Sequence, residues 1–142
     1  MAIEIKDVDG GIGNIIIARG VVTGQEYIET HKRLLSQDKE KLEKYRYCLS
    51  DWTEITQMDV PTQDIKKVAD LCISASKVNH DAIVAIVAHQ DLIYGLARMF
   101  AALADETGWE IIVTRSMKKA ESWIKKRVKD KFNIENLTIR SD

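Results

Sequence analysis

An unbroken apolar run, AIVAIVA at residues 82–88, lies in the second half of the chain. The run is too short for a typical buried helix, and none of its side chains is suited to facing water. Strands of this kind are covered on both faces, as they are in parallel sheets flanked by helices. The run therefore predicts a central, buried strand in an α/β domain.

Strand-like and helix-like segments alternate along the rest of the chain. Further strands are predicted at residues 3–6, 12–18, 45–49 and 109–114, the first two forming a hairpin. Helices are predicted to begin at Thr23, at Pro61 and Thr62, at residue 91 and at Ser116. Alternation with short connections favours a largely parallel sheet with right-handed crossovers. We predict one α/β domain over residues 1–142, with a mostly parallel sheet of about four to five strands and about four helices.

Three stretches are predicted to lie outside these elements. The charged residues 37–44 fit a solvated helix end and loop, and the Asp-rich and Thr-rich residues 50–60 fit a connection. Residues 131–142 are expected to form a C-terminal tail, which is either frayed or an arm that pairs with a sheet edge.

Charge and composition exclude several classes of function. With 21 basic and 22 acidic side chains the net charge is -1, so no overall field attracts nucleic acid. The first residues lack a signal-peptide pattern, and no apolar stretch is long enough to span a membrane, which favours a cytoplasmic protein. Cys48 and Cys72 lie in apolar segments without a metal-binding spacing, and we expect both to be buried free thiols.

Three short motifs resemble a known family. The stretch LSDWTEITQMDVPTQDI at residues 49–65 resembles the part of STAS domains, the anti-sigma-factor-antagonist fold, where a strand ends in Met-Asp and a helix begins. YGLARMF at residues 94–100 and AESWI at residues 120–124 resemble small, largely uncharacterised bacterial proteins described as STAS-like or CRAL-TRIO-like. The resemblance spans roughly residues 12–128 and implies a STAS-like sheet with helices packed on it.

The resemblance also indicates one regulatory position. In regulatory STAS domains a phosphorylatable Ser follows the Met-Asp pair, and its added charge switches partner binding. Here the run is Met58-Asp59-Val60-Pro61-Thr62, which places Pro61 at the Ser position. Thr62 is the neighbouring candidate for phosphorylation, or it is simply a residue of the first helical turn.

The predicted strand ends carry polar residues that could form a small site. Ligands of open α/β sheets bind beyond the carboxyl ends of the strands, where helix amino-termini attract anions. The candidates for a ligand or anion site are Asp51, Thr53, His89, Gln90, Arg115 and Ser116. Their alternative roles are turns, helix caps and a solvated cation. No metal-ligand spacing, nucleophile motif or nucleotide loop appears, so we predict no metal, no cofactor and no enzymatic activity.

The helix predicted at residues 91–106 is apolar almost all round. One stripe is expected to face the sheet and consists of Ile93, Leu96, Ala97, Phe100 and Ala104. A second stripe consists of Leu92, Gly95, Met99 and Ala102, with Tyr94 and Arg98 at its rim. This second stripe packs on a neighbouring helix, on a second subunit or around an apolar ligand.

These observations lead to three hypotheses about function. The first is a non-catalytic STAS-like regulatory or protein-interaction module that forms a homodimer. The alternative, implied by the CRAL-TRIO-like resemblance and the apolar helix, is a carrier of a small apolar ligand or lipid. The third is an enzyme of unknown class, which requires Asp51, His89 or Arg115 to converge in a pocket.

Overall fold

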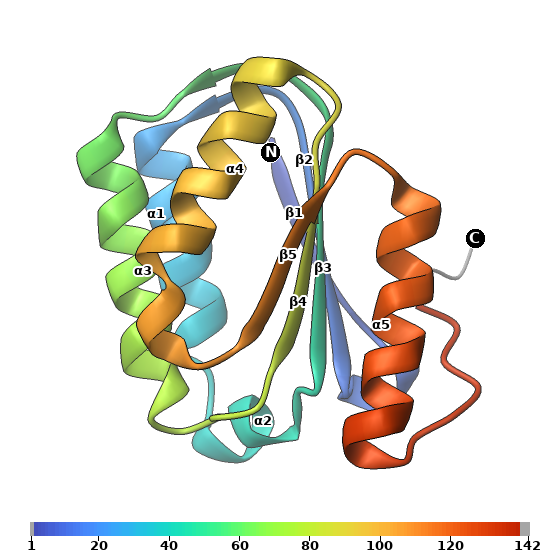
Figure 1. Ribbon diagram of the computed structural model, residues 1–142. Coiled ribbons are helices and arrows are strands. Elements are labelled where there is room, and N and C mark those ends of the chain that lie inside the picture. The colour runs from blue at the N-terminus through green and yellow to red at the C-terminus, as the bar shows by residue number, and fades with distance from the viewer. Residues whose placement is uncertain (1, 140–142) are drawn as a thin grey trace.

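A single five-stranded sheet runs through the computed structural model, which describes residues 2–139 (Figure 1). The strands follow the order β1-β2-β3-β4-β5, and β1 is antiparallel to β2 while all other neighbours are parallel. The strands are β1 (Ile3–Val8), β2 (Gly13–Thr23), β3 (Tyr47–Asp59), β4 (Ile83–Val87) and β5 (Glu110–Thr114). The predicted α/β class with a mostly parallel sheet is confirmed.

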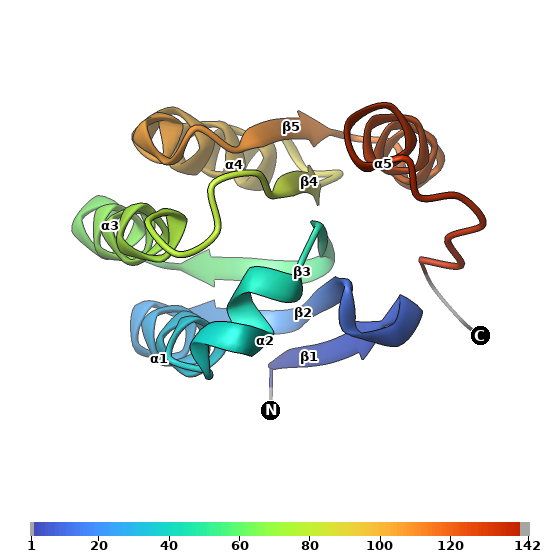
Figure 2. The ribbon, with the colours of Figure 1, turned by 90° about the horizontal axis from the view of Figure 1, so that it is seen from below.

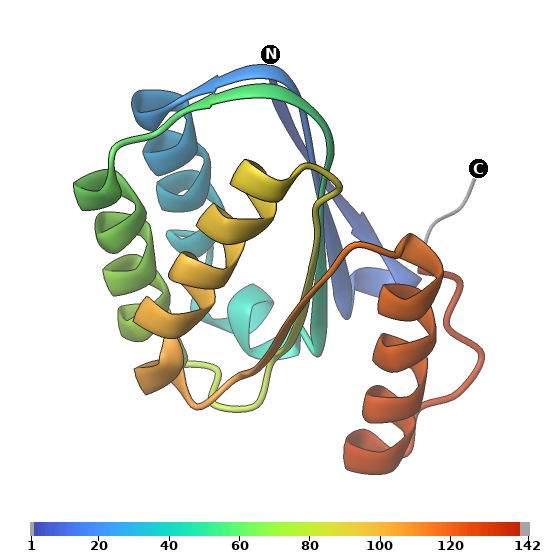
Figure 3. The ribbon, with the colours of Figure 1, turned by 45° about the horizontal axis from the view of Figure 1, so that its top comes forward.

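Helices cover both faces of this sheet (Figure 2). They are α1 (Gly24–Leu35), α2 (Lys39–Lys44), α3 (Thr62–Ser76), α4 (Asp91–Leu103) and α5 (Met117–Phe132). Figures 2 and 3 show α1, α3 and α4 side by side on one face, with α5 on the opposite face. Two 3-10 turns, η1 (Asp9–Gly11) and η2 (Asp105–Thr107), complete the fold.

The apolar run at residues 82–88 forms β4 and its flanks, and every one of its residues is buried. The strands β3 and β5 pair with β4 on its two sides and take up its backbone hydrogen bonds, and helices cover both of its faces. The prediction of a buried interior strand is confirmed, although β3 rather than β4 is the middle strand of the sheet.

The predicted helix starts are also confirmed in their details. The Thr23 Oγ1 atom accepts a hydrogen bond from the Glu26 amide at 3.2 Å, and the Ser116 Oγ atom accepts one from the Lys119 amide at 3.1 Å. Both bonds satisfy amide groups that the first helical turn leaves without partners. After α4 the chain turns at Gly108, whose φ of 74° suits a residue without a Cβ atom.

Two strands are longer than predicted. The stretch at residues 50–60, expected to be a connection, continues β3 to Asp59, and β2 likewise extends to Thr23. The two extensions pair with each other beyond the ends of β4 and β5, with Thr23 opposite Asp59. Polar and apolar residues are mixed in both extensions, with Val22 and Ile55 buried in the core, and the pairing of the two extensions with each other makes them strands. Asp51 and Thr53 therefore lie within β3 and not after it.

Two segments predicted to be irregular, residues 39–44 and the C-terminal tail, are instead ordered by buried apolar side chains. Residues 39–44, expected to be loop, form the short helix α2, because Leu42 is buried against the main core. The described part of the tail, residues 133–139, is neither frayed nor paired with a sheet edge. Leu137 and Ile139 are buried in it, at 8% and 0% exposure. The rest of the predicted tail, residues 140–142, lies outside the described residues.

The tail is held by the carboxylate of Asp9 in the turn η1. Asp9 accepts hydrogen bonds from the Thr138 amide (2.8 Å), the Thr138 hydroxyl (2.7 Å) and the Ile139 amide (3.0 Å). It also accepts the hydroxyl of Tyr47 at 2.5 Å. The tail therefore closes the smaller apolar cluster, which lies between the sheet and α5.

Candidate functional site

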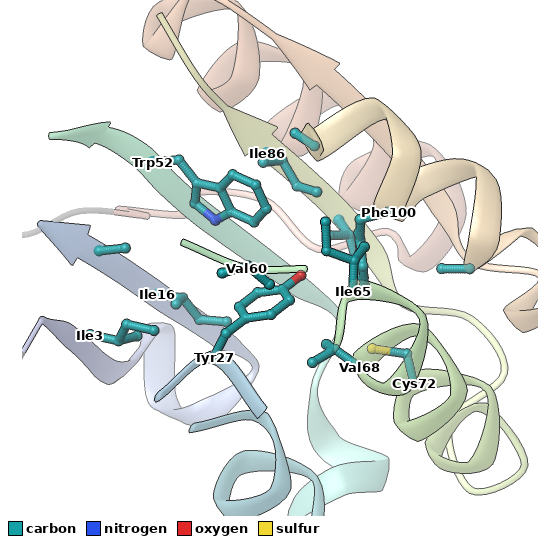
Figure 4. Packing of buried hydrophobic residues seen from close by; sticks show 14 of the residues in the cluster. Ile3, Ile16, Tyr27, Trp52, Val60, Ile65, Val68, Cys72, Ile86 and Phe100 are labelled. Atoms are coloured by element: carbon teal, nitrogen blue, oxygen red, sulfur yellow. The ribbon is translucent and has the colours of Figure 1, made fainter. Parts of the chain in front are cut away.

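The larger apolar cluster, between the sheet and the helices α1, α3 and α4, encloses a cavity of about 80 Å³. Side chains from the strands and from all three helices line it, including Ile16, Leu34, Trp52, Cys72, Ile86 and Phe100. Figure 4 shows several of these side chains converging from opposite sides of the cluster. The lining is mostly apolar, as is typical of pockets for small molecules.

Two buried polar atoms among the lining residues have no hydrogen-bond partner within the described part of the chain. They are the hydroxyl of Tyr27 and the Oδ1 atom of Asn14, on residues that are 3% and 4% exposed. In Figure 4 the Tyr27 ring extends from α1 with its hydroxyl directed toward α3. A buried polar group without a partner costs about 1–3 kcal/mol, so both atoms gain from a bound molecule that supplies one.

His31 lies one helical turn after Tyr27 and also lines the cavity. Its Nδ1 atom is 2.8 Å from the carbonyl oxygen of Tyr27, which can only accept, so Nδ1 carries the proton. Burial lowers the pKa of His31, although the hydrogen bond to the Tyr27 carbonyl opposes this, and the ring is neutral at neutral pH. The Nε2 atom of this tautomer is an acceptor.

Aromatic contacts fix the position of the Tyr27 ring. It packs edge-to-face against His31, with ring centroids 4.8 Å apart, and against Trp52 at 6.0 Å. The Trp52 indole donates in turn to the Ser50 hydroxyl at 2.8 Å. The Tyr27 hydroxyl is thus held in place by its neighbours without being bonded to them.

The two cysteines give the cavity no reactive group. Both Cys48 and Cys72 line it as free thiols. Burial raises the pKa of each thiol to about 12, and for Cys48 the neighbouring Cys72 adds to this. Both remain protonated at neutral pH, and a thiol is a poor nucleophile compared with a thiolate.

A small hydrogen-bonded group closes the cavity at the carboxyl ends of the helices. The Asn79 side chain donates to the carbonyl oxygens of Leu42 (2.8 Å) and Tyr45 (2.7 Å). The indole of Trp109 donates to the Asn79 carbonyl oxygen at 2.7 Å. Asn79 and Trp109 are half-buried and line the cavity, so this group lies between the cavity and solvent.

The ligand-site residues predicted from sequence are distributed over both faces of the sheet. Asp51 is in register with Ile17 and Val87, which belong to the α5 side. It is 5% exposed and accepts from the Thr53 amide at 2.9 Å and the Thr53 hydroxyl at 2.7 Å. The structure therefore brings Asp51 and Thr53 together within β3.

The other predicted residues lie near the end of β5. Arg115 donates to the His89 carbonyl oxygen at 2.9 Å, pairs with Asp91 at 2.8 Å and stacks over the Tyr94 ring at 4.3 Å. Gln90 donates to the Ile55 carbonyl oxygen at 3.2 Å. Arg115 thus contacts the backbone of His89 on the α4 side of the sheet. Asp51 lies on the opposite, α5 side. Ser116 caps the amino end of α5.

The two stripes of α4 differ in exposure. In the predicted sheet-facing stripe Ile93, Ala97, Phe100 and Ala104 are buried, and Leu96 is half-buried. In the second stripe Met99 is half-buried, while Leu92, Gly95 and Ala102 are exposed, as is the rim residue Arg98. Leu92 is 71% exposed, so no helix of the described chain covers it. Thr62, the predicted regulatory residue, is exposed at the first position of α3.

The sequence assigned no function to Asn14, Tyr27 or His31. The signals are visible in retrospect: Asn14 interrupts an apolar strand, and Tyr27 and His31 are four residues apart on a buried helical stripe. Each signal is equally typical of a polar core residue with an ordinary partner. Only the packed structure shows that two of these residues carry an unpaired atom beside a cavity.

The sheet with its antiparallel first strand, with α1, α3 and α4 on one face and α5 on the other, defines a STAS-like α/β fold. Among solved structures, the chain is similar to an uncharacterized protein of the DUF3478 family from Shewanella loihica PV-4 with a SpoIIAA-like fold. The TM-score is 0.53 at 20% sequence identity, over 87% of this chain and 92% of that chain. The predicted STAS-like fold is confirmed. A scan against models of protein families finds no match, and a search of curated proteins finds none.

Two further features bear on the class of site. Within residues 2–139 no three His, Cys, Asp or Glu side chains are grouped so that they could hold a metal ion. None of the helices in the same part of the chain is both long enough and apolar enough to cross a membrane.

Proposed function

We propose that this chain is a non-catalytic, STAS-like binding module that takes a small, largely apolar molecule with one polar end into the cavity beneath α1, α3 and α4. The observation that supports this proposal is the apolar cavity with two buried, unpaired polar atoms, Tyr27 OH and Asn14 Oδ1. Apolar lining favours the body of the ligand, and the unpaired atoms favour a hydrogen-bonding group at one end.

The size and chemistry of the cavity limit the ligand. An engineered apolar cavity of about 150 Å³ holds one benzene molecule, so about 80 Å³ suits a smaller molecule or the end of a longer apolar chain. Tyr27 offers a hydroxyl that donates and accepts, whereas Asn14 Oδ1 only accepts. An alcohol hydroxyl can donate to Asn14 Oδ1, and it can either donate to or accept from the Tyr27 hydroxyl. A hydroxyl is therefore the simplest polar group that fits this end of the cavity.

Native mass spectrometry of the protein purified from cells without denaturation tests this proposal. We expect a species heavier than the polypeptide that reverts to the polypeptide mass after unfolding. Isobutanol, added to the unloaded protein, is expected to raise the unfolding temperature more than isobutane at equal activity, because only the alcohol supplies a hydrogen bond. A ligand-free protein that responds to neither compound contradicts the proposal.

Substitution Tyr27→Phe separates binding from stability. Removing an unpaired hydroxyl is expected to raise the free energy of unfolding of the unloaded protein by about 1 kcal/mol. The same change is expected to weaken alcohol binding about tenfold if the ligand pairs with Tyr27. Tyr45→Phe is the matched control, because the Tyr45 hydroxyl donates to Asp7 at 2.7 Å and its loss should destabilise the protein. Destabilisation of both variants to the same extent would show that Tyr27 is an ordinary core residue.

A second candidate function, a protein-interaction module, is favoured by the exposed stripe of α4. Leu92 is 71% exposed at the start of that helix, beside the exposed Gly95. A contiguous exposed apolar stripe commonly marks a contact site, and Leu92, Gly95, Met99 and Ala102 form such a stripe. We expect Leu92→Ser to change stability by less than about 0.5 kcal/mol while abolishing co-purification of a partner. Val21→Ser, at the other exposed large apolar residue (48%), is the control and should retain the partner.

A further inference from the structure

The two edges of the sheet differ in how they are protected. At one edge β1 carries the charged residues Glu4, Lys6 and Asp7, and Glu4 and Lys6 are exposed. At the other edge β5 reads EIIVT, with no charged residue, proline or bulge in its centre. Natural edge strands are usually blunted by charges, prolines or bulges, because a bare apolar edge pairs with other chains. The central residues of the β5 edge, Ile111 to Val113, lack these devices.

Two hydrogen bonds to β4 define which backbone groups of β5 face outward. The Glu110 amide donates to the Ala82 carbonyl oxygen at 3.2 Å, and the Thr114 carbonyl oxygen accepts from the Ala88 amide at 3.0 Å. Backbone groups of successive strand residues point alternately to the two sides. The amide and carbonyl groups of Ile111 and Val113 therefore point away from β4. In the described part of the chain no strand lies beyond them.

The side chains of this edge are also incompletely covered. Ile111, Ile112 and Val113 are all half-buried, whereas every residue of β4 is buried. Ile111 and Val113 lie on the α4 side and Ile112 on the α5 side. Figure 2 shows β5 at the margin of the sheet, with α4 and α5 flanking it but not crossing its outer edge. The β5 edge therefore has unpaired backbone groups, and apolar side chains are partly exposed on both faces of the sheet beside it.

We propose that β5 pairs antiparallel with β5 of a second copy of this chain, around a two-fold axis at Ile112, so that one sheet runs through both copies. In this register Ile111 of one copy lies opposite Val113 of the other, and these residues exchange the outward-facing hydrogen bonds. Ile112 lies opposite its own counterpart as a non-hydrogen-bonded pair. A two-fold axis repeats each contact, as in the commonest class of homodimer.

Charge supports a second copy as the occupant. The register places Glu110 opposite Thr114, and Trp109 opposite Arg115, so no like charges oppose each other. The Glu110 carboxylate is already paired within its own chain, with Arg127 at 2.6 Å and Lys131 at 3.3 Å. The five strand residues are therefore compatible with themselves in the antiparallel orientation.

Disulfide formation at the axis tests the register. Residues at a non-hydrogen-bonded antiparallel position have Cα atoms about 4.5 Å apart, which is within the range that a disulfide spans. We expect Ile112→Cys to give a covalent dimer on mild oxidation. Thr114→Cys is the matched control on the same strand and face, because its counterpart would be about 13 Å away. Cys48 and Cys72 should not interfere, since burial raises their pKa values to about 12.

Light scattering of edge variants tests the dimer itself. Val113→Pro removes an outward amide and no hydrogen bond to β4, so we expect at least a tenfold weaker dimer with an unchanged circular dichroism spectrum. Val113→Thr keeps the amide and should remain dimeric. A monomeric wild-type protein at about 100 μM, or a dimer that Val113→Pro leaves intact, overturns the proposal. If Val113→Pro fails to fold, the presence or absence of the Ile112→Cys cross-link decides the question.

Discussion

Replacing Asp9 by alanine is expected to lower the free energy of unfolding by about 3 kcal/mol and to release the C-terminal segment from the sheet. The Asp9 carboxylate accepts four hydrogen bonds, from the Tyr47 hydroxyl, the Thr138 amide and hydroxyl, and the Ile139 amide. Without them the hydroxyl of Tyr47 loses its partner, and the tail loses the three hydrogen bonds that position Thr138 and the buried Ile139. Hydrogen bonds to a charged group are worth more than neutral ones, so the combined loss is large.

Urea unfolding and limited proteolysis measure the two parts of this expectation. Proteolysis of the Asp9→Ala variant should remove the tail before the rest of the chain is cut. Asp7→Ala is the matched control, because Asp7 lies in the same hairpin and bonds Tyr45 and Lys41 but not the tail. Its cost should be about 1 kcal/mol, without earlier proteolysis of the tail. Equal behaviour of the two variants would contradict the role assigned to Asp9.

The lowered pKa of the Asp9 carboxylate leads us to expect that the stability of the protein depends on pH. Burial raises the pKa of Asp9, but the hydrogen bonds from Tyr47, Thr138 and Ile139 outweigh it and hold the pKa below the ordinary value of 3.8. A carboxylate with a lowered pKa contributes stability above its unfolded pKa and loses it as the pH falls through the folded pKa. The wild-type protein should therefore lose stability below about pH 4 more steeply than Asp9→Ala does.

Replacing Gly13 by alanine is expected to destabilise the protein by about 3 kcal/mol or more. A Cβ atom at Gly13 would stand 2.1 Å from the Tyr47 ring, far closer than any ordinary contact. The ring cannot simply move away, because Tyr47 is 1% exposed and its hydroxyl is bonded to Asp9. The added methyl group must therefore separate β2 from β3 or displace the ring and break its hydrogen bond.

Thermal unfolding of two glycine variants checks this reason. Gly95 lies in the exposed part of α4, and a Cβ atom there would meet nothing within 4 Å. Gly95→Ala should raise the free energy of unfolding by about 0.5–1 kcal/mol, since alanine loses less backbone entropy in a helix. If Gly13→Ala were as stable as the wild-type protein, the close approach of Tyr47 to the β2 backbone would be wrong.

Local patterns sufficed for the elements whose signals are local. The run at residues 82–88 and the helix start at Pro61 and Thr62 depend on neighbours in sequence, and both predictions are confirmed. The residue pattern does not predict the extension of β3 to Asp59, because the extension depends on pairing with β2; only the resemblance to STAS domains implies a strand that ends at Met58-Asp59. The order of the tail was missed for the same reason, since Thr138 bonds a residue 129 positions away. Contacts between residues that are far apart in the sequence produce no periodic pattern of apolar residues from which they could be predicted.

The candidate site was harder to predict than the fold. The sequence pattern predicts a site of polar residues at the strand ends, such as Asp51 and Arg115, but the structure places these two on opposite sides of the sheet. The cavity residues Tyr27 and Asn14 look like ordinary members of apolar segments. What distinguishes them is a missing hydrogen-bond partner, which is a property of packing and has no counterpart in residue type.

The paired extensions of β2 and β3 have a mechanical consequence for the cavity. Thr23 and Asp59 are opposite each other in that pairing, and α1 and α3 begin within three residues of them. The Asp64 carboxylate fills the space that Gly24 leaves by having no side chain, so the amino ends of the two helices approach each other closely. Beyond the carboxyl end of α3, Asn79 donates instead to the carbonyl oxygens of Leu42 in α2 and of Tyr45. The pairing of β2 with β3 therefore sets the spacing at which α1 and α3 begin, and with it the distance between two of the helices that line the cavity.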